Sequence, residues 1–193
     1  MTPDGFALPA AVDLEFAVAA VFKVTGVPIG LEGAEITSAT RAGAQAPAVS
    51  LGGRNARDVV QYLLSRYVDS DAREVEGVIL IRPREVWEGR RAIVLERLRL
   101  SLEIEDAGYD EAVGALVSRL CEGVRLPSPR RPLNLPRVSL VVQNITALEA
   151  LVLFSKATGS AWIVKPSRPE DRLSLSLIAP GGVTTGVSCR PSR

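Results

Sequence analysis

The chain has 193 residues, with 23 basic and 22 acidic side chains and no histidine. A formal net charge of +1 gives no reason to expect broad attraction to nucleic acid or to a membrane surface. Because histidine is absent, a Ser-His-Asp triad is excluded, and no histidine can activate a cysteine thiol.

The first half of the chain predicts the element order β-α-β-β-α-β-β. Asp13 and Asn55 stand where helix N-caps are expected, each before a segment with apolar residues at helical spacing, and Gly26 can end the first helix. Glu76-Gly77 separates two short strands as a hairpin turn does. The expected strands are 6–8, 27–31, 49–51, 72–75 and 78–82.

The second half predicts similar elements after a connector. Leucine and isoleucine alternate from Leu98 to Ile104, which is typical of a strand with one buried face. A helix then ends near Gly123, and Thr146 to Glu149 has the form of a capping box at the start of the next helix. The remaining expectations are a loop at 126–136, strands at 138–142, 162–164 and 173–178, and a loosely held tail beyond Pro180.

An internal repeat organises these elements. The segment 47–51 (PAVSL) recurs as 136–140 (PRVSL), an offset of 89 residues that also pairs Asn55 with Asn144. The fold class expected is therefore α+β, with two tandem β-α-β-β-α-β-β modules whose helices pack on small mixed sheets. The expected boundaries are 4–84 for the first module, 85–94 for a connector, 95–180 for the second module and 181–193 for a flexible tail.

The repeated pattern resembles the secretin and TonB N-terminal short domain. The resemblance is carried by Phe6-Ala7-Leu8-Pro9, Thr25-Gly26-Val27, Val49-Ser50-Leu51 and the segment from Gly77 to Pro83, with a similar match from Val138 to Gly159. It implies a periplasmic or otherwise extracytoplasmic module that works through protein contacts. Asp4 and the lack of a basic start do not fit a signal peptide, so the residues allow either a cytosolic chain or one whose export signal was removed. The resemblance implies the second. The chain departs from the family in its two copies, with neither a secretin core nor an outer-membrane barrel following them.

Cys121 and Cys189 are the two cysteines of the chain. One interpretation is a disulfide that pins the tail onto a helix of the second module, in agreement with an oxidising compartment. The other is two unrelated cysteines, with Cys121 as apolar packing at the end of its helix.

Two further features suggest contacts. Arg125, Arg130, Arg131 and Arg137 fall in one proline-rich segment that contains no acid. They predict either a loop that docks an acidic partner, a phosphate or nucleic acid, or a solvated connection. Trp87 lies in the connector, where it is expected to anchor the two modules to each other or a partner to the chain.

These observations predict a non-enzymatic interaction or adaptor module of the cell envelope. Docking is expected through an exposed sheet edge or the adjacent helix face, onto another envelope protein. The alternative is a module that binds a small molecule or cell-wall fragment in a cleft between the two copies. No cofactor, no metal and no nucleic acid are expected as ligands. No insertion of this chain into a membrane is expected either, since no uninterrupted apolar run reaches about 18 residues.

Overall fold

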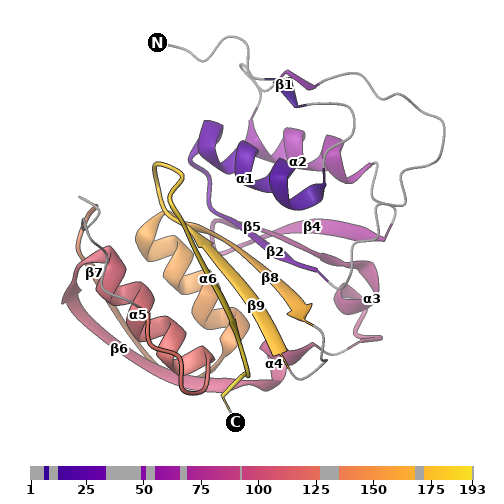
Figure 1. Ribbon diagram of the computed structural model, residues 1–193. Helices are drawn as coiled ribbons and strands as arrows, with labels where there is room; N and C mark the ends of the chain where they lie inside the picture. Colours follow the sequence, from indigo (N-terminus) through magenta and orange to yellow (C-terminus); the bar gives the residue numbers. More distant parts are fainter. Residues whose placement is uncertain are drawn as a thin grey trace.

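One mixed sheet of six strands lies at the centre of the molecule, in the order β10-β9-β8-β2-β5-β4 (Figure 1). The structure is a computed structural model that describes residues 7–8, 13–33, 49–50, 55–65, 69–91, 93–126, 135–167 and 172–192. The predicted α+β class is confirmed. The strands are β2 (Ile29–Glu32), β4 (Ser70–Val75), β5 (Val78–Pro83), β8 (Ala161–Ser167), β9 (Arg172–Ile178) and β10 (Thr184–Cys189).

Helices α1 (Leu14–Thr25) and α2 (Ala56–Leu64) cover one side of this sheet, here called the α1/α2 face (Figure 1). Both begin at the predicted caps, because the Asp13 carboxylate accepts from the Phe16 N–H at 2.7 Å and Asn55 accepts from the Asp58 N–H at 2.8 Å. A small sheet joins β1 (Ala7–Leu8) to β3 (Val49–Ser50). The sheet residues that pack under the two helices are Ile29, Leu31, Ile79, Ile81, Ala161, Ile163 and Ile178.

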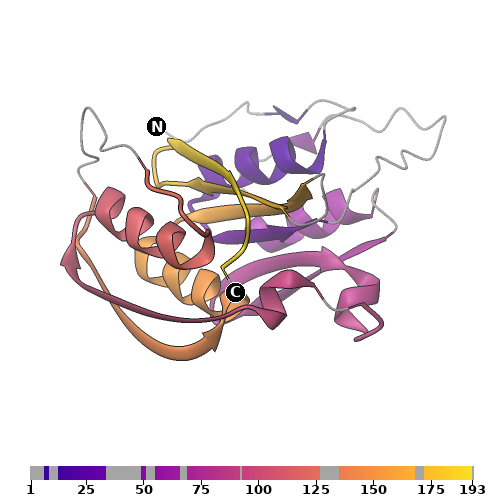
Figure 2. The same cartoon turned by 60° about the horizontal axis from the view of Figure 1, so that its bottom comes forward.

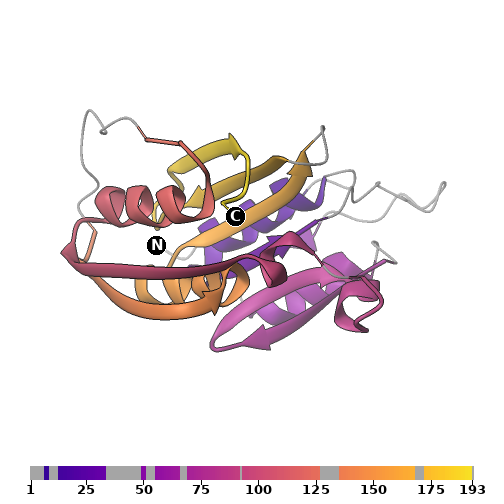
Figure 3. The same cartoon turned by 90° about the horizontal axis from the view of Figure 1, so that it is seen from below.

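Helices α5 (Tyr109–Leu120) and α6 (Ala147–Thr158) cover the opposite side, here called the α5/α6 face. A long antiparallel ribbon of β6 (Arg99–Ala107) and β7 (Val138–Thr146) runs along the outer side of these helices (Figures 2 and 3). The connector between the halves forms two short helices, α3 (Arg84–Trp87) and α4 (Val94–Arg97). Residues of the sheet that face α5 and α6 include Leu80, Trp162, Val164, Leu173, Leu175 and Leu177.

The two halves of the chain contribute three strands each to the same sheet. They meet where β8 pairs in parallel with β2, with Gly30 opposite Trp162. Trp162 is fully buried, and a Cβ atom on Gly30 would lie 2.4 Å from its ring carbon Cζ2. Glycine at position 30 therefore makes room for a large side chain of the other half. The two halves thus share one continuous sheet. The expected domain boundaries at residues 84 and 95 stay a prediction.

The expectation of a flexible tail at 181–193 is wrong for the described part of that segment. Residues Thr184–Cys189 form β10, which pairs antiparallel with β9 from Thr184 opposite Ile178 to Cys189 opposite Leu173. The physical reason is that β10 pairs with the free edge of the β8–β9 hairpin. Its position beside β9 corresponds to the position of β2 beside β5 in the first half. A segment rich in glycine, threonine and serine is thus held by a neighbouring strand.

The constant offset of 89 residues does not hold at the helix starts. Thr146 caps α6 in a capping box with Glu149, as predicted, whereas Asn144 belongs to β7. Asn144 has a positive φ of 50° at an irregularity in the β6–β7 register, and its N–H donates to Ser101 Oγ at 3.0 Å. Such a bulge inserts residues without ending the strand. The pairing of Asn55 with Asn144 is therefore wrong in structural terms.

Candidate docking edge

Strand β4 forms one end of the six-stranded sheet. Its hairpin with β5 turns through Glu76 and Gly77, which both have positive φ angles, 54° and 83°, as a type I′ turn requires. In such a hairpin the pair that flanks the turn is hydrogen-bonded, and bonded pairs then alternate along the strands. The backbone groups of Ser70, Ala72 and Glu74 consequently point away from β5. This outward side of β4 is called the β4 edge.

Hydrogen bonds at Ala72 agree with this phase. Its carbonyl oxygen accepts from Gln61 Nε2 of α2 at 3.4 Å, and its N–H donates to the Asp71 carboxylate at 2.9 Å. Both partners are side chains, and the bond from Gln61 is long and exposed. Among the described residues no strand pairs with the β4 edge. A partner strand could replace the two side-chain bonds with backbone bonds.

A small depression runs between α2 and β4 on the α1/α2 face. Its floor includes the buried side chains of Val60 and Ile79, which are 1% and 5% exposed. Its rim carries both signs of charge. A strand added at the β4 edge would thus find an apolar contact for a small side chain beside its backbone. The lining residues are Arg57, Val60, Gln61, Ala72, Arg73, Glu74 and Ile79.

On the α5/α6 face, Trp87 holds the charged residues of β4 in place. Its Nε1–H donates to the carbonyl oxygen of Asp71 at 3.2 Å, and the guanidinium carbon of Arg73 lies 4.5 Å from its ring centre. Arg82 of β5 approaches the same indole ring at 5.0 Å. Trp87 therefore lies beside β4 and β5, while the aromatic residue at the β2–β8 junction is Trp162.

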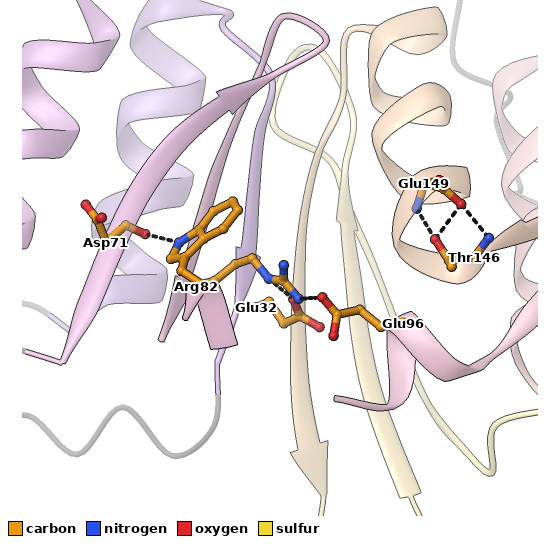
Figure 4. A network of polar contacts seen from close by, with 7 residues as sticks. Glu32, Asp71, Arg82, Glu96, Thr146 and Glu149 are labelled. Carbon is orange, nitrogen blue, oxygen red and sulfur yellow. Dashed lines mark hydrogen bonds and ion pairs between the residues drawn. The ribbon is translucent and has the colours of Figure 1, made fainter. Parts of the chain in front are cut away.

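A buried ion network supports this end of the sheet. Arg82 is 4% exposed and donates to Glu32 of β2 through Nε at 2.7 Å and to Glu96 of α4 through Nη2 at 2.6 Å (Figure 4). Burial raises the pKa of Glu32 to about 7, although the nearby Arg82 charge acts in the opposite direction. The network fastens the connector helix α4 to the sheet and holds the Arg82 guanidinium next to the Trp87 ring.

The two cysteines lie together at the other end of the sheet. Cys121 and Cys189 form a disulfide, with their Cα atoms 5.5 Å apart. Backbone hydrogen bonds reinforce the link, since the Glu122 N–H donates to the Arg190 carbonyl and the Ser192 N–H donates to the Leu120 carbonyl, both at 2.9 Å. The disulfide thus ties β10 to the end of α5, as the first interpretation of the cysteines expected.

Only part of the expected arginine loop lies within the described residues. Arg130 and Arg131 fall outside them, so the docking-loop hypothesis stays a prediction. Arg125 is exposed, and Arg137 forms an ion pair with Asp106 at 2.7 Å. Arg137 is therefore paired with an acid of β6 and does not point alone into solvent.

The comparisons with known proteins return no match: no family model, no curated protein and no solved structure matches the chain. The resemblance to the secretin and TonB N-terminal short domain stays a prediction. Across the described ranges, no helix combines the length and apolar character needed to cross a membrane. No group of three or more Asp, Glu, Cys or His side chains in these ranges could hold a metal ion.

Sequence reasoning did not single out the β4 edge or the Arg82 network. A signal for the edge was present, because β4 (SDAREV) mixes charged and small residues, whereas β5 begins with the continuous apolar run Val78 to Ile81. Charged residues of this kind are typical of strands at the edge of a sheet. No comparable signal marked Glu32 and Arg82, which lie 50 residues apart.

Proposed function

We propose that this chain is a non-enzymatic protein–protein interaction module of the cell envelope, which docks by adding a partner strand to the β4 edge. The observation that carries the proposal is the β4 edge itself, whose outward backbone groups at Ala72 bond, within the described part of the chain, to the side chains of Gln61 and Asp71. The depression beside it, with Val60 and Ile79 at its floor, offers a contact for a partner side chain. Strand addition uses these two elements together.

The two halves of the molecule support the proposal. Each half contains a β-hairpin after its second helix, β4–β5 in the first and β8–β9 in the second. The first strand of the second hairpin, β8, pairs on its outer side with β2. The first strand of the first hairpin, β4, occupies the matching position at the end of the sheet. The first strand of the second hairpin therefore already pairs with a further strand on the side that is unpaired by any described strand in β4.

The test is affinity capture from cell-envelope extract with the immobilised full chain, followed by a binding measurement with the protein recovered. Ala72→Pro removes the outward N–H at the middle of β4 without removing a bond to β5. We expect this variant to lose the partner, because a proline prevents a strand from adding at that point. Gly186→Pro, the same change on the outward side of β10, is the matched control and should keep the partner. Equal binding by the two folded variants would contradict the proposal.

The alternative of a ligand cleft between the two copies receives no support at the β2–β8 junction. Gly30 and Trp162 pack against each other there, and the two strands pair directly. The described depression lies instead within the first half, between α2 and β4. A ligand cleft between the two copies stays a prediction.

A further inference from the structure

We propose that a second copy of this chain binds at the β4 edge, so that two β4 strands pair antiparallel about a twofold axis at Ala72. This inference rests on the proposed function, because it names a partner for the same edge. It predicts a symmetric dimer in which the two six-stranded sheets join. Twofold dimers of this isologous kind are the commonest form of protein oligomer.

The backbone phase of β4 permits such pairing. Ser70, Ala72 and Glu74 point their backbone groups outward, so Ala72 of each copy can exchange two hydrogen bonds with Ala72 of the other. A twofold axis normal to the sheet keeps the α1/α2 faces of the two copies on the same side. Ala72 also has the smallest side chain in β4, so the two strands can meet there without side-chain crowding.

The charges of β4 select this register. Asp71 and Arg73 flank Ala72, and both project onto the α5/α6 face, where Arg73 lies opposite Leu80. When Ala72 pairs with its counterpart, Asp71 of each copy lies opposite Arg73 of the other, at the positions where side chains come closest. The edge is therefore complementary to itself in charge.

The neighbouring registers are unfavourable for the same reason. A slip by one pairing step in one direction places Asp71 opposite its own counterpart, and a slip in the other direction places Arg73 opposite its counterpart. Like charges directly opposite each other destabilise a strand pair. The register centred on Asp71 also places Asp69 opposite Arg73. Among the three closest antiparallel registers, only the one centred on Ala72 pairs opposite charges without placing like charges opposite each other.

Trp87 prepares both charged residues for this contact. It fixes the backbone of Asp71 by a hydrogen bond and stacks under the guanidinium group of Arg73. Ordering these groups before association lowers the entropy that dimer formation costs. The other end strand, β10, carries no charged residue between Thr184 and Cys189, so it offers no comparable selection of a partner or register.

The test is sedimentation equilibrium of the full chain and of two charge-reversal variants. We expect the native chain to dimerise with rising concentration. Asp71→Arg and Arg73→Asp should each weaken self-association by about tenfold or more, because each converts two attractive cross-strand pairs into two repulsive ones. An equimolar mixture of the two variants should form a heterodimer, since opposite charges then face each other again. Val141→Lys, which adds a charge at an exposed residue of β7, is the control and should leave the dimer intact.

Several results would overturn this inference. One is a native chain that stays monomeric at the highest concentration it tolerates. A second is a dimer that survives both charge reversals, and a third is a dimer that is lost with Gly186→Pro, which would place the contact at β10. The outcomes for the two proposals are separable. A monomeric chain whose envelope partner is lost with Ala72→Pro contradicts the dimer and keeps the proposed function. A β4-dependent dimer whose envelope partner survives Ala72→Pro does the opposite.

Discussion

The two halves of the molecule build the same local pattern with strands from different places. In the first half, the strand beside the hairpin is β2, which follows α1 directly and runs parallel to β5. In the second half, the strand in that position is β10, which arrives from the end of the chain and runs antiparallel to β9. The described residues after α5, 121–126, contribute no strand to the sheet and form a single bridge at Cys121.

This difference shows that the position of a strand in the sheet does not depend on the order of the strands along the chain. A strand position beside a hairpin can be filled from either direction, because both parallel and antiparallel neighbours complete the backbone hydrogen bonds. The strand with the longer path to its position is also the one that carries a covalent link, Cys189 to Cys121. By contrast, β2 is held on both sides, by β5 and by β8.

Substitutions at the junction between the halves should have the largest effect on the free energy of unfolding. Trp162→Ala should destabilise the whole chain by about 3–5 kcal/mol, because the indole is fully buried against β2. Gly30→Ala should cost about 1–3 kcal/mol in the native background, since its Cβ would collide with the indole. Urea unfolding of both variants provides the measurement.

The double variant decides whether these two residues act together. Once Trp162 is replaced by alanine, Gly30→Ala should cost almost nothing, because the collision has been removed. The two changes would then be strongly non-additive, as expected for residues in direct contact. Additive costs would instead show that Gly30 is needed for the β2 backbone and not for the contact between halves.

The second prediction concerns the strand that reaches its place from the end of the chain. Replacing both Cys121 and Cys189 with alanine should destabilise the protein by about 4 kcal/mol, since the bond closes a long loop of 68 residues. Amide exchange in β10 should accelerate far more than exchange in β2. Equal acceleration in the two strands would mean that the disulfide stabilises the entire sheet and not the attachment of β10.

Local features of both halves were predictable because they depend on neighbouring residues. Asp13, Asn55 and Thr146 are helix caps in the sequence and in the structure, and the Glu76-Gly77 turn forms the expected hairpin. Each is fixed within about four residues of the chain. The periodicity of Leu98 to Ile104 likewise identified β6, although the strand extends to Ala107.

The features that were missed depend on distant parts of the chain. Gly181, Gly182 and Gly186 weaken the strand signal of the segment after Pro180, although Thr184, Thr185 and Val187 favour a strand. The segment becomes a strand because β9 offers it an edge. Likewise, the contact of Gly30 with Trp162 and the ion pair of Glu32 with Arg82 join residues far apart in sequence. One sequence without its homologues contains no signal that would place these pairs together.

The smallest predicted effect distinguishes β2 from β10 by pH. Glu32 lies at the end of β2 beside Arg82 of β5 and Glu96 of α4, whereas β10 has no acidic or basic residue. Because burial raises the pKa of Glu32 from 4.5 to about 7, the folded state holds its proton more tightly than the unfolded state does. The stability from this group is therefore complete below pH 4.5 and is lost as the pH rises through about 7.

Glu32→Gln isolates this effect, since glutamine keeps the shape of the side chain but does not titrate. Between pH 4.5 and a pH above 7, the free energy of unfolding of the native chain should fall by at most about 3 kcal/mol relative to that of the variant. Urea unfolding of both proteins across this range measures the difference, and the other titrating groups cancel in it. A difference that stayed constant would show that the Arg82 charge offsets the burial of Glu32 completely. A difference that rose with pH would mean that the ion pair outweighs burial, and that β2 is fastened to β5 mainly by charge.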